Sequence, residues 1–390
     1  MALLASFAGV MKGFGGILLA IVILLVMVTI HEFGHYVVGK WLKFQINEFS
    51  VGFGPAILKK RSKKTGEVFA LRVIPLGGYC AFEGEDTYED ETDEPFEELQ
   101  EKHEDVKPQG AKFNDQKPWK RILVLLAGAT MNYLLALSLI FVMFGCFGCI
   151  HSYVNVYADK QVELPAFEAD TIGYKDIVLQ VDGKDIVLIS DYVDALSGRQ
   201  KGEEVEIVLL RRNTEGAWSR RTFFMPVQTD CDFNNMTDTP GVFAALGLDA
   251  ETYAFSGVTM KEGFFQTIGA SFAYSFKIGG MVLRSLGELI TGKLPISSMG
   301  GPVTTISVTA QAAAGGALSF LNIASFIGVN LAVFNLLPIP ALDGSKVVFC
   351  LIEWIRKKPI NRKVETIIHL VGIIFLFAFA ILVDILQFIL

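Results

Sequence analysis

Charged side chains are missing from two long stretches of this 390-residue sequence. Neither 122–150 nor 294–342 contains an Asp, Glu, Lys or Arg, and shorter uncharged runs occupy 13–30 and 366–383, the last interrupted only by the polar His369. The longer runs exceed the roughly 20 residues that cross the hydrocarbon core of a bilayer. With 52% hydrophobic residues, the composition excludes an ordinary soluble enzyme and predicts a membrane protein with about four transmembrane helices.

Cysteine is also scarce. The five cysteines are an odd number and lie in segments of different character, so the sequence predicts no disulfide framework. Cys146 and Cys149 have the CxxC spacing, but they close an apolar run and have no second pair nearby. We expect them to pack as small apolar side chains rather than to bind a metal or exchange disulfides.

Basic side chains are nearly absent from 83–105, which holds one lysine among many carboxylates. Without this run, the net charge of −7 would become positive. The run lacks aliphatic periodicity, so we interpret it as a solvated or disordered insertion. An acidic tether for a basic partner is the alternative.

Lysine and arginine gather instead in two loops, and they orient the chain because basic residues near the ends of spans favour the cytoplasmic side. The first loop holds basic clusters within 40–64 and 112–121, and the second holds one at 356–363. Both loops are therefore predicted to be cytoplasmic, and the segment between the second and third spans to lie outside with both chain ends. We expect the first apolar run to be retained rather than cleaved, because a polar motif follows it without a break.

Three segments outside the spans have patterns of their own. Residues 155–230 alternate apolar and polar side chains around turn signals such as Asp182-Gly183, which predicts a small β-rich domain. Residues 258–292 place apolar side chains at helical spacing broken by charges, which favours an amphipathic helix at the membrane surface over a fifth span. Two extended, glycine-punctuated segments around 48–55 and 68–79 predict a β-hairpin.

His31-Glu32-Phe33-Gly34-His35 is an HExxH motif at the end of the first apolar run. If the helix continues through it, His31 and His35 lie one turn apart on one face, where two neutral imidazoles can bind one Zn²⁺. Glu32 then lies beside the open position of the metal and can take a proton from the bound water, whose pKa zinc lowers to about 7. The alternative is an interfacial polar cluster without a metal, but such groups are costly in lipid unless they have a function.

A hydrolytic zinc site uses a third protein ligand and keeps one position for water. Asp343 is the candidate in comparable surroundings, within the run Asn335-Leu-Leu-Pro338-Ile-Pro340-Ala-Leu-Asp343-Gly344. The predicted topology brings the ends of the first and third spans to the same side of the membrane, so Asp343 can meet the two histidines. Taken alone, it would be interpreted as a helix cap after a proline-rich turn.

The HExxH motif on a first span and the N-x-x-P-x-P-x-x-D-G run on a later one together resemble the site-2 protease family of intramembrane zinc metalloproteases. Gly52–Pro55 and Arg72–Tyr79 are similar to the membrane-reentrant β-hairpin of bacterial members of the regulator of sigma-E protease type. Asn114–Ala136 looks like their second span, and Gly301–Val303 resembles the stretch before their third.

The resemblance implies three zinc ligands and one catalytic glutamate: His31, His35, Asp343 and Glu32. It also implies that an unwound substrate is held by side-chain amides and by carbonyls freed by proline, at Asn330, Asn335, Pro338 and Pro340. For the two prolines, a helix kink without substrate contact is the alternative. The β-rich segment would be a single PDZ domain.

The sequence departs from the family pattern at three places. The usual Asp-Gly-Gly-His reads Asp343-Gly344-Ser345-Lys346, which puts a lysine near the expected metal site. The usual Ala-Gly-Pro of the second span reads Ala127-Gly128-Ala129. The PDZ signature is also altered, to Thr171-Ile172 and Lys175-Asp176.

We therefore expect a membrane α-helical fold with about four transmembrane helices, a cytoplasmic membrane-associated β-hairpin and an extracytoplasmic PDZ-like β-rich domain. In chain order, the expected parts are a first transmembrane helix with HExxH (1–38), a cytoplasmic loop with the hairpin and the acidic insertion (39–118), a second transmembrane helix (119–150), the PDZ-like domain (155–230), the amphipathic surface helix (258–292), the third transmembrane region (300–345) and the fourth transmembrane helix (364–390).

The expected function is regulated intramembrane proteolysis by a zinc endopeptidase of the bacterial cytoplasmic (inner) membrane. Its expected partners are Zn²⁺, membrane lipid and single-span substrates such as anti-sigma factors or signal-peptide remnants, with no nucleic acid. Two alternatives stay open. A non-catalytic PDZ-bearing adaptor would be indifferent to Glu32→Gln, and a metal transporter would leave Glu32 without a role.

Overall fold

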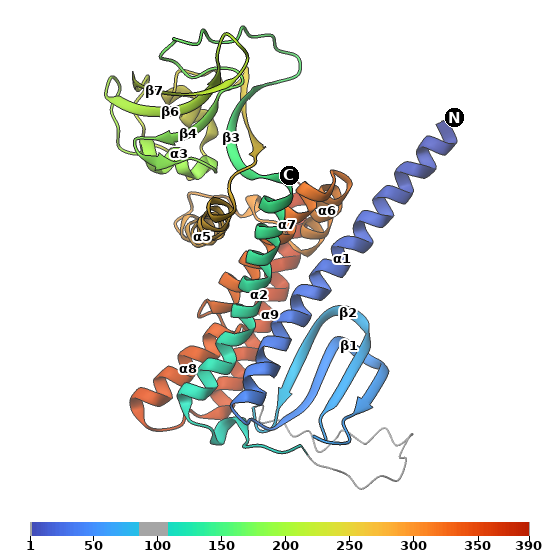
Figure 1. The fold of residues 1–390 in the computed structure, drawn as a ribbon. Helices are drawn as coiled ribbons and strands as arrows, with labels where there is room; N and C mark the ends of the chain where they lie inside the picture. Colours follow the sequence, from blue (N-terminus) through green and yellow to red (C-terminus); the bar gives the residue numbers. More distant parts are fainter. Residues whose placement is uncertain (1, 86–107, 390) are drawn as a thin grey trace. The chain divides into compact units, whose positions relative to one another are not determined.

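A computed structural model describes residues 2–85 and 108–389 (Figure 1). Most of the acidic run predicted at 83–105 therefore lies outside the described residues. The chain divides into two compact units, one formed by Met1–Leu139 with Met299–Leu390 and the other by Ile140–Ser298. All five cysteines are free, as the sequence predicted.

Four helices in the described part of the chain are long and apolar enough to cross a membrane, the same number as the spans predicted from the sequence. They are α1 (Ala2–Trp41), α2 (Pro118–Phe147), α7 (Ala317–Leu336) and α9 (Arg362–Ile389). Within the first unit, α1, α2 and α7 share an apolar core around Met27, Ala324 and Ile327. Gly328 of α7 lies so close to α2 that a Cβ there would come within 2.9 Å of the Ala136 methyl group.

The apolar region predicted at 300–345 holds two helices and the start of a third rather than one span. The helix α6 (Pro302–Ala314) ends at two glycines, of which Gly316 has a φ of 106° that helices do not accept. Only α7 in this region is long and apolar enough to span a membrane. The prolines of 337–342 then separate α7 from α8 (Asp343–Arg356), because proline disfavours helix both at its own position and at the residue before it.

The hairpin is formed by β1 (Ile46–Arg61) and β2 (Val68–Phe82), which contact the second half of α1 (Figure 1). Both strands bend, so the first part of β1 is paired twice. Residues 46–51 pair with 78–82 on one side and with 68–71 on the other. Polar side chains also link the two strands, because the Arg72 guanidinium of β2 donates hydrogen bonds to Glu48, Ser50 and Tyr79.

The second unit is built on a six-stranded antiparallel sheet of order β7-β6-β4-β3-β8, with β5 paired to β4. The strands are β3 (Cys149–Val156), β4 (Ile177–Val181), β5 (Lys184–Asp185), β6 (Glu204–Arg212), β7 (Trp218–Pro226) and β8 (Tyr253–Met260). The helices α3 (Ile189–Leu196) and α4 (Thr239–Ala245) pack on it. The sheet therefore extends past both limits predicted for this domain, 155 and 230, because β3 and β8 pair along their whole lengths.

The helix predicted at 258–292 is α5 (Phe264–Ile290), and residues 258–260 belong to β8 instead. Its charged side chains bind within the second unit. Lys277 pairs with Asp191 at 2.8 Å, and the buried Glu288 accepts the Met236 N–H at 3.0 Å. Tyr274, Ile278 and Val282 of α5 are buried, whereas its other face exposes large apolar side chains, at Phe264, Phe265, Phe272, Phe276, Leu283 and Ile290. Two short 3-10 turns, Phe113–Asp115 and Ile296–Ser298, complete the described elements.

Candidate active site

The helix α1 continues without a break through the HExxH motif, so His31 and His35 lie on one face and are both buried. Gly34 is needed between them. A Cβ at Gly34 would come within 2.4 Å of the Ala127 carbonyl oxygen, so α1 and α2 cross here in backbone contact. This contact places the two histidines directly against α2.

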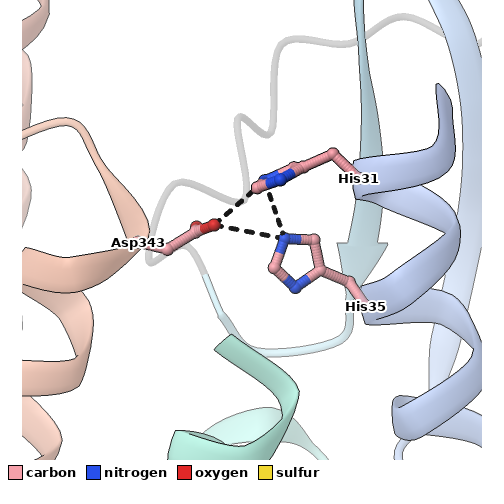
Figure 2. Close-up of side chains that lie close together, drawn as sticks. All are labelled: His31, His35 and Asp343. Carbon is pink, nitrogen blue, oxygen red and sulfur yellow. Dashed lines mark hydrogen bonds and ion pairs between the residues drawn. The ribbon is translucent and has the colours of Figure 1, made fainter. Parts of the chain in front are cut away.

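Asp343 completes the cluster from the other end of the chain. Figure 2 shows His31 and His35 of α1 pointing toward the carboxylate at the start of α8. Asp343 Oδ2 is 3.0 Å from His31 Nε2 and 3.3 Å from His35 Nε2, and the two ring nitrogens are 3.2 Å apart. Within residues 2–85 and 108–389, this is the one group of three or more metal-ligating side chains that meets at a single point.

The cap interpretation of Asp343 is wrong. The N-cap of α8 is Leu342, and no side chain caps the first turn of the helix. Asp343 is the first helical residue, and its carboxylate instead contacts the two ring nitrogens of α1.

The second nitrogen of each ring has a partner that fixes the ring plane. His35 Nδ1 is 2.8 Å from the Val124 carbonyl oxygen, which can only accept. The hydrogen of neutral His35 is therefore on Nδ1, and the lone pair of Nε2 points at the cluster. His31 Nδ1 lies 3.4 Å from the side-chain amides of both Asn132 and Asn335.

The amide of Asn132 can serve His31 in the same way. Asn132 is buried, and its Oδ1 has no hydrogen-bond partner in the described part of the chain. Because the oxygen and nitrogen of an amide can be exchanged by a half-turn, Oδ1 can face His31 Nδ1 and accept its hydrogen. That arrangement satisfies Asn132 and leaves the lone pair of His31 Nε2 directed at the cluster.

These atoms fit a zinc ion. Two imidazole nitrogens and one carboxylate oxygen are a ligand set of hydrolytic zinc sites, which keep a fourth position open. Lone pairs that converge at 3.2 Å repel each other unless a cation or a proton lies between them. Gly128 of α2 leaves the space in front of the rings, since a Cβ there would come within 2.4 Å of His35 Nε2.

Glu32 follows His31 on α1 and is partly exposed, unlike the two histidines. The strand β2 passes beside it. A Cβ at Gly78 would lie in ordinary contact with Glu32 Cγ, at 3.5 Å, so β2 borders the Glu32 side chain. Cys80 on β2 is buried and does not belong to the group of metal-ligating side chains that meets at this point.

The four residues predicted to hold substrate are placed differently from one another. Asn335, in the last turn of α7, reaches His31. Asn330 is partly exposed and lies five residues earlier on α7, which turns its side chain about 140° away around the helix. Pro338 and Pro340 lie in the loop between α7 and α8. Lys346 lies one turn after Asp343 and pairs with Glu85 at 2.7 Å.

The sequence alone did not assign a role to Asn132, Gly128 or the Val124 carbonyl, although all three positions stand in the run 114–136 that resembled a second span. A lone asparagine in an uncharged span was the available signal, because a buried amide in an apolar helix needs a polar partner.

Comparison with known proteins shows which family the chain belongs to. The profile of peptidase family M50 matches residues 19–379. A protein of Clostridium perfringens is 31% identical over 378 residues, which cover 95% of this chain and 97% of the relative. The regulator of sigma-W protease RasP of Bacillus subtilis is 25% identical over 421 residues, covering 91% of this chain and 94% of the relative. The zinc metalloprotease RasP of Bacillus licheniformis is also 25% identical, over 413 residues and 90% and 93% of the two chains. With a match over nearly its whole length, the chain belongs to peptidase family M50, the site-2 protease family of zinc metalloproteases.

Proposed function

We propose that this zinc metalloprotease cuts single-span membrane proteins within or beside the bilayer. The observation that carries the proposal is the convergence of His31, His35 and Asp343 at the end of a helix apolar enough to span a membrane. Anti-sigma factors and remnants of signal peptides are the proposed substrates. The first choice is supported by the relative named regulator of sigma-W protease.

His31 and His35 would hold the zinc ion through Nε2, and Asp343 through a carboxylate oxygen. When bound, zinc polarises the scissile carbonyl and lowers the pKa of a water to about 7. The Val124 carbonyl and Asn132 hold the ring planes, so the ligands need little rearrangement to receive the ion.

Glu32 is the proposed general base. Its side chain follows His31 on the helix and lies beside β2, and in this proposal its carboxylate faces the open side of the cluster. It accepts a proton from the attacking water and passes it to the leaving amine of the cut peptide bond. Its partial exposure fits this role, because a base needs access to substrate while the ligands need burial.

The substrate would be held in an extended form at the end of α7. A transmembrane helix satisfies its own backbone groups, so cutting it requires local unwinding and new hydrogen-bond partners. We propose that these partners come from the amides and proline-freed carbonyls predicted from the sequence: Asn330, Asn335, Pro338 and Pro340. Asn335 would then serve twice, since it also contacts His31.

The proposed setting is the bacterial cytoplasmic membrane, with the site toward the cytoplasm. The basic clusters at 40–64, 112–121 and 356–363 support this orientation. The β1–β2 hairpin would then lie in the cytoplasmic half of the membrane, and its exposed apolar side chains support contact with lipid. The sheet of the second unit would be an outer PDZ-like domain, with the apolar side of α5 on the membrane surface.

The test uses the purified full-length protein in lipid discs with a single-span substrate whose outer domain has been removed. We expect cleavage that a zinc chelator abolishes. Glu32→Gln should lower the rate by about 10²–10⁴-fold while the zinc content stays unchanged, and Asp343→Ala should lose zinc. Glu215→Gln, in an exposed turn of the second unit, is the matched control.

Cleavage by the Glu32→Gln variant at the original rate would overturn the role of Glu32. No zinc-dependent cleavage by the unaltered protein would favour the adaptor. Movement of zinc across sealed vesicles would favour the transporter.

A further inference from the structure

The loop that leads into Asp343 contains a strained turn. The Leu342 N–H donates to the Ile339 carbonyl at 3.1 Å, which places Pro340 and Ala341 at the centre of a four-residue turn. Ala341 has a φ of 82°, the value that a type II turn requires at its third residue. Glycine or asparagine is usual there, because a Cβ is disfavoured at positive φ. Something outside the turn must therefore hold Ala341 in this conformation.

His369 of α9 supplies a hydrogen-bond acceptor at this point. Its Nδ1 accepts the Ala341 N–H at 3.1 Å, and its ring packs edge-on against Phe349 with centroids 5.7 Å apart. Type I and type II turns differ in the direction of their central peptide unit. An acceptor fixed opposite the Ala341 N–H therefore selects the type II form.

Gly372, one turn further along α9, packs against the same peptide unit. A Cβ at Gly372 would come within 2.4 Å of Pro340 Cβ and 2.7 Å of the Pro340 carbonyl oxygen. The two residues of α9 thus contact both ends of the Pro340–Ala341 peptide unit. His369 binds its N–H, and Gly372 packs against its carbonyl.

The connection between this turn and the metal site is short and rigid. Asp343 comes two residues after Ala341, and the Ser345 hydroxyl ties α8 back to the Leu342 carbonyl at 2.7 Å. A Cβ at Gly344 would come within 2.3 Å of the Leu337 carbonyl oxygen, so the start of α8 is pressed against the end of α7. The direction of the turn therefore sets where the Asp343 carboxylate points.

We propose that His369 and Gly372 are positioning residues for the metal site. They hold the Pro340–Ala341 turn in its type II form and thereby aim Asp343 at His31 and His35. This inference rests on the proposed function, in which Asp343 is the third zinc ligand. It gives a role to the one strongly polar side chain that interrupts the apolar run of the fourth span, a position where polar groups mark functional sites.

The test measures zinc affinity of the full-length protein by competition with a chelator. His369→Phe keeps a ring against Phe349 but removes the acceptor, and we expect it to weaken zinc binding about 10- to 100-fold, the range found for residues that orient metal ligands. His369→Asn can still accept from the Ala341 N–H and should stay within about threefold of the unaltered protein. Gly372→Ala should weaken binding as His369→Phe does.

A suppressor separates this role from general packing. Glycine adopts a φ of 82° without strain, so adding Ala341→Gly to His369→Phe should recover on the order of fivefold in affinity. Val371→Phe, on the exposed side of α9, and Gly145→Ala, which has open space around it, are the matched controls and should bind zinc normally.

Unchanged zinc affinity in His369→Phe would overturn the inference. So would an equal loss in His369→Phe and His369→Asn with no recovery by Ala341→Gly, since that pattern indicates packing alone. Asp343→Ala distinguishes the two proposals. If it binds zinc normally, the ligand set of the proposed function has failed; if it loses zinc while His369→Phe does not, only the positioning role has failed.

Discussion

Gly128 is the residue on which the space between α2 and the two imidazole rings depends. A Cβ there would come within 2.4 Å of His35 Nε2 and 2.8 Å of His31 Nε2, distances that force a ring to move. We expect Gly128→Ala to weaken zinc binding at least tenfold, measured by chelator competition. Thr130→Ala, on the exposed side of the same helix, should bind zinc normally. Normal zinc affinity in Gly128→Ala would show that the imidazole rings of His31 and His35 can move aside without loss of binding, and would contradict this prediction.

At the scale of single residues, the sequence predicted the side chains that take part in the chemistry but not the side chains that hold them in position. The types and spacing of His31, Glu32 and His35 are enough to predict two ligands and a base, because the helix period alone brings the histidines together. The roles of Asn132 and His369 depend on which carbonyl or amide stands opposite them across the fold. No local pattern contains that information.

At the scale of elements, the buried carboxylate of Glu67 anchors the β1–β2 hairpin to α1, the helix that carries the HExxH motif. Glu67 accepts hydrogen bonds from Tyr36 at 3.2 Å and Thr65 at 3.0 Å and also pairs with Lys40. Tyr36 follows His35 directly, so this contact fixes β2 against the part of α1 that carries the site. These contacts do not involve the side chains of the proposed metal ligands.

We expect Glu67→Gln to loosen the hairpin and leave the zinc ligands in place, because the amide keeps the size but loses the charge that Lys40 requires. The variant should raise KM for the single-span substrate severalfold while zinc affinity stays normal. Kinetics at several substrate concentrations, with metal analysis of the same samples, check this. A loss of zinc with KM unchanged would contradict the separation of the two roles.

The helix α8 is anchored at its far end by Glu353, which is buried with Arg121 of α2 and also contacts Arg362 at 2.9 Å. Burial alone would raise the pKa of Glu353. The Ile360 N–H, at 3.0 Å, and Arg121 more than offset this and hold the pKa below its ordinary value of 4.5. The ion pairs of the charged form therefore stabilise the fold.

Because the pKa of Glu353 is lowered in the folded state, its stabilisation is complete above pH 4.5 and is lost as the pH falls through the lowered value. Glu353→Gln should lose this contribution at neutral pH, at a cost of about 3–5 kcal/mol for an uncompensated buried charge. Thermal unfolding between pH 7 and the acid limit checks this. The unfolding temperature of the variant should approach that of the unaltered protein as the pH falls. A difference that stays constant with pH would contradict the stabilising role of the charged Glu353.

For the whole molecule, the two compact units should respond differently to metal removal. The three proposed ligands all lie in the first unit. A metal that binds only the folded form at a thousandfold excess over its Kd stabilises that form by about 4 kcal/mol. We expect chelation to increase amide hydrogen exchange at the end of α1 and the start of α8 and to leave the sheet of the second unit unchanged. Equal increases in both units would contradict their independence.

Long-range pairing also explains where the sequence prediction of the fold stopped. Four apolar runs were enough to predict four spans, because burial in lipid acts on each run separately. The limits of the sheet were missed because β8 is held in place by β3, about a hundred residues earlier. In the same way, the charges of α5 are bound to groups such as Asp191 and Met236, which only the folded chain brings near.

The distance along the chain between the ligands has a consequence in time. Asp343 follows His35 at a distance of roughly 300 residues, and these must be added one by one during synthesis. At about 5–20 residues per second, this takes roughly 15–60 s. With Asp343 as the third ligand, a growing chain holds its base and two imidazoles in the membrane throughout that interval without a complete site. On this proposal, the protease can cut its neighbours only once Asp343 has been made.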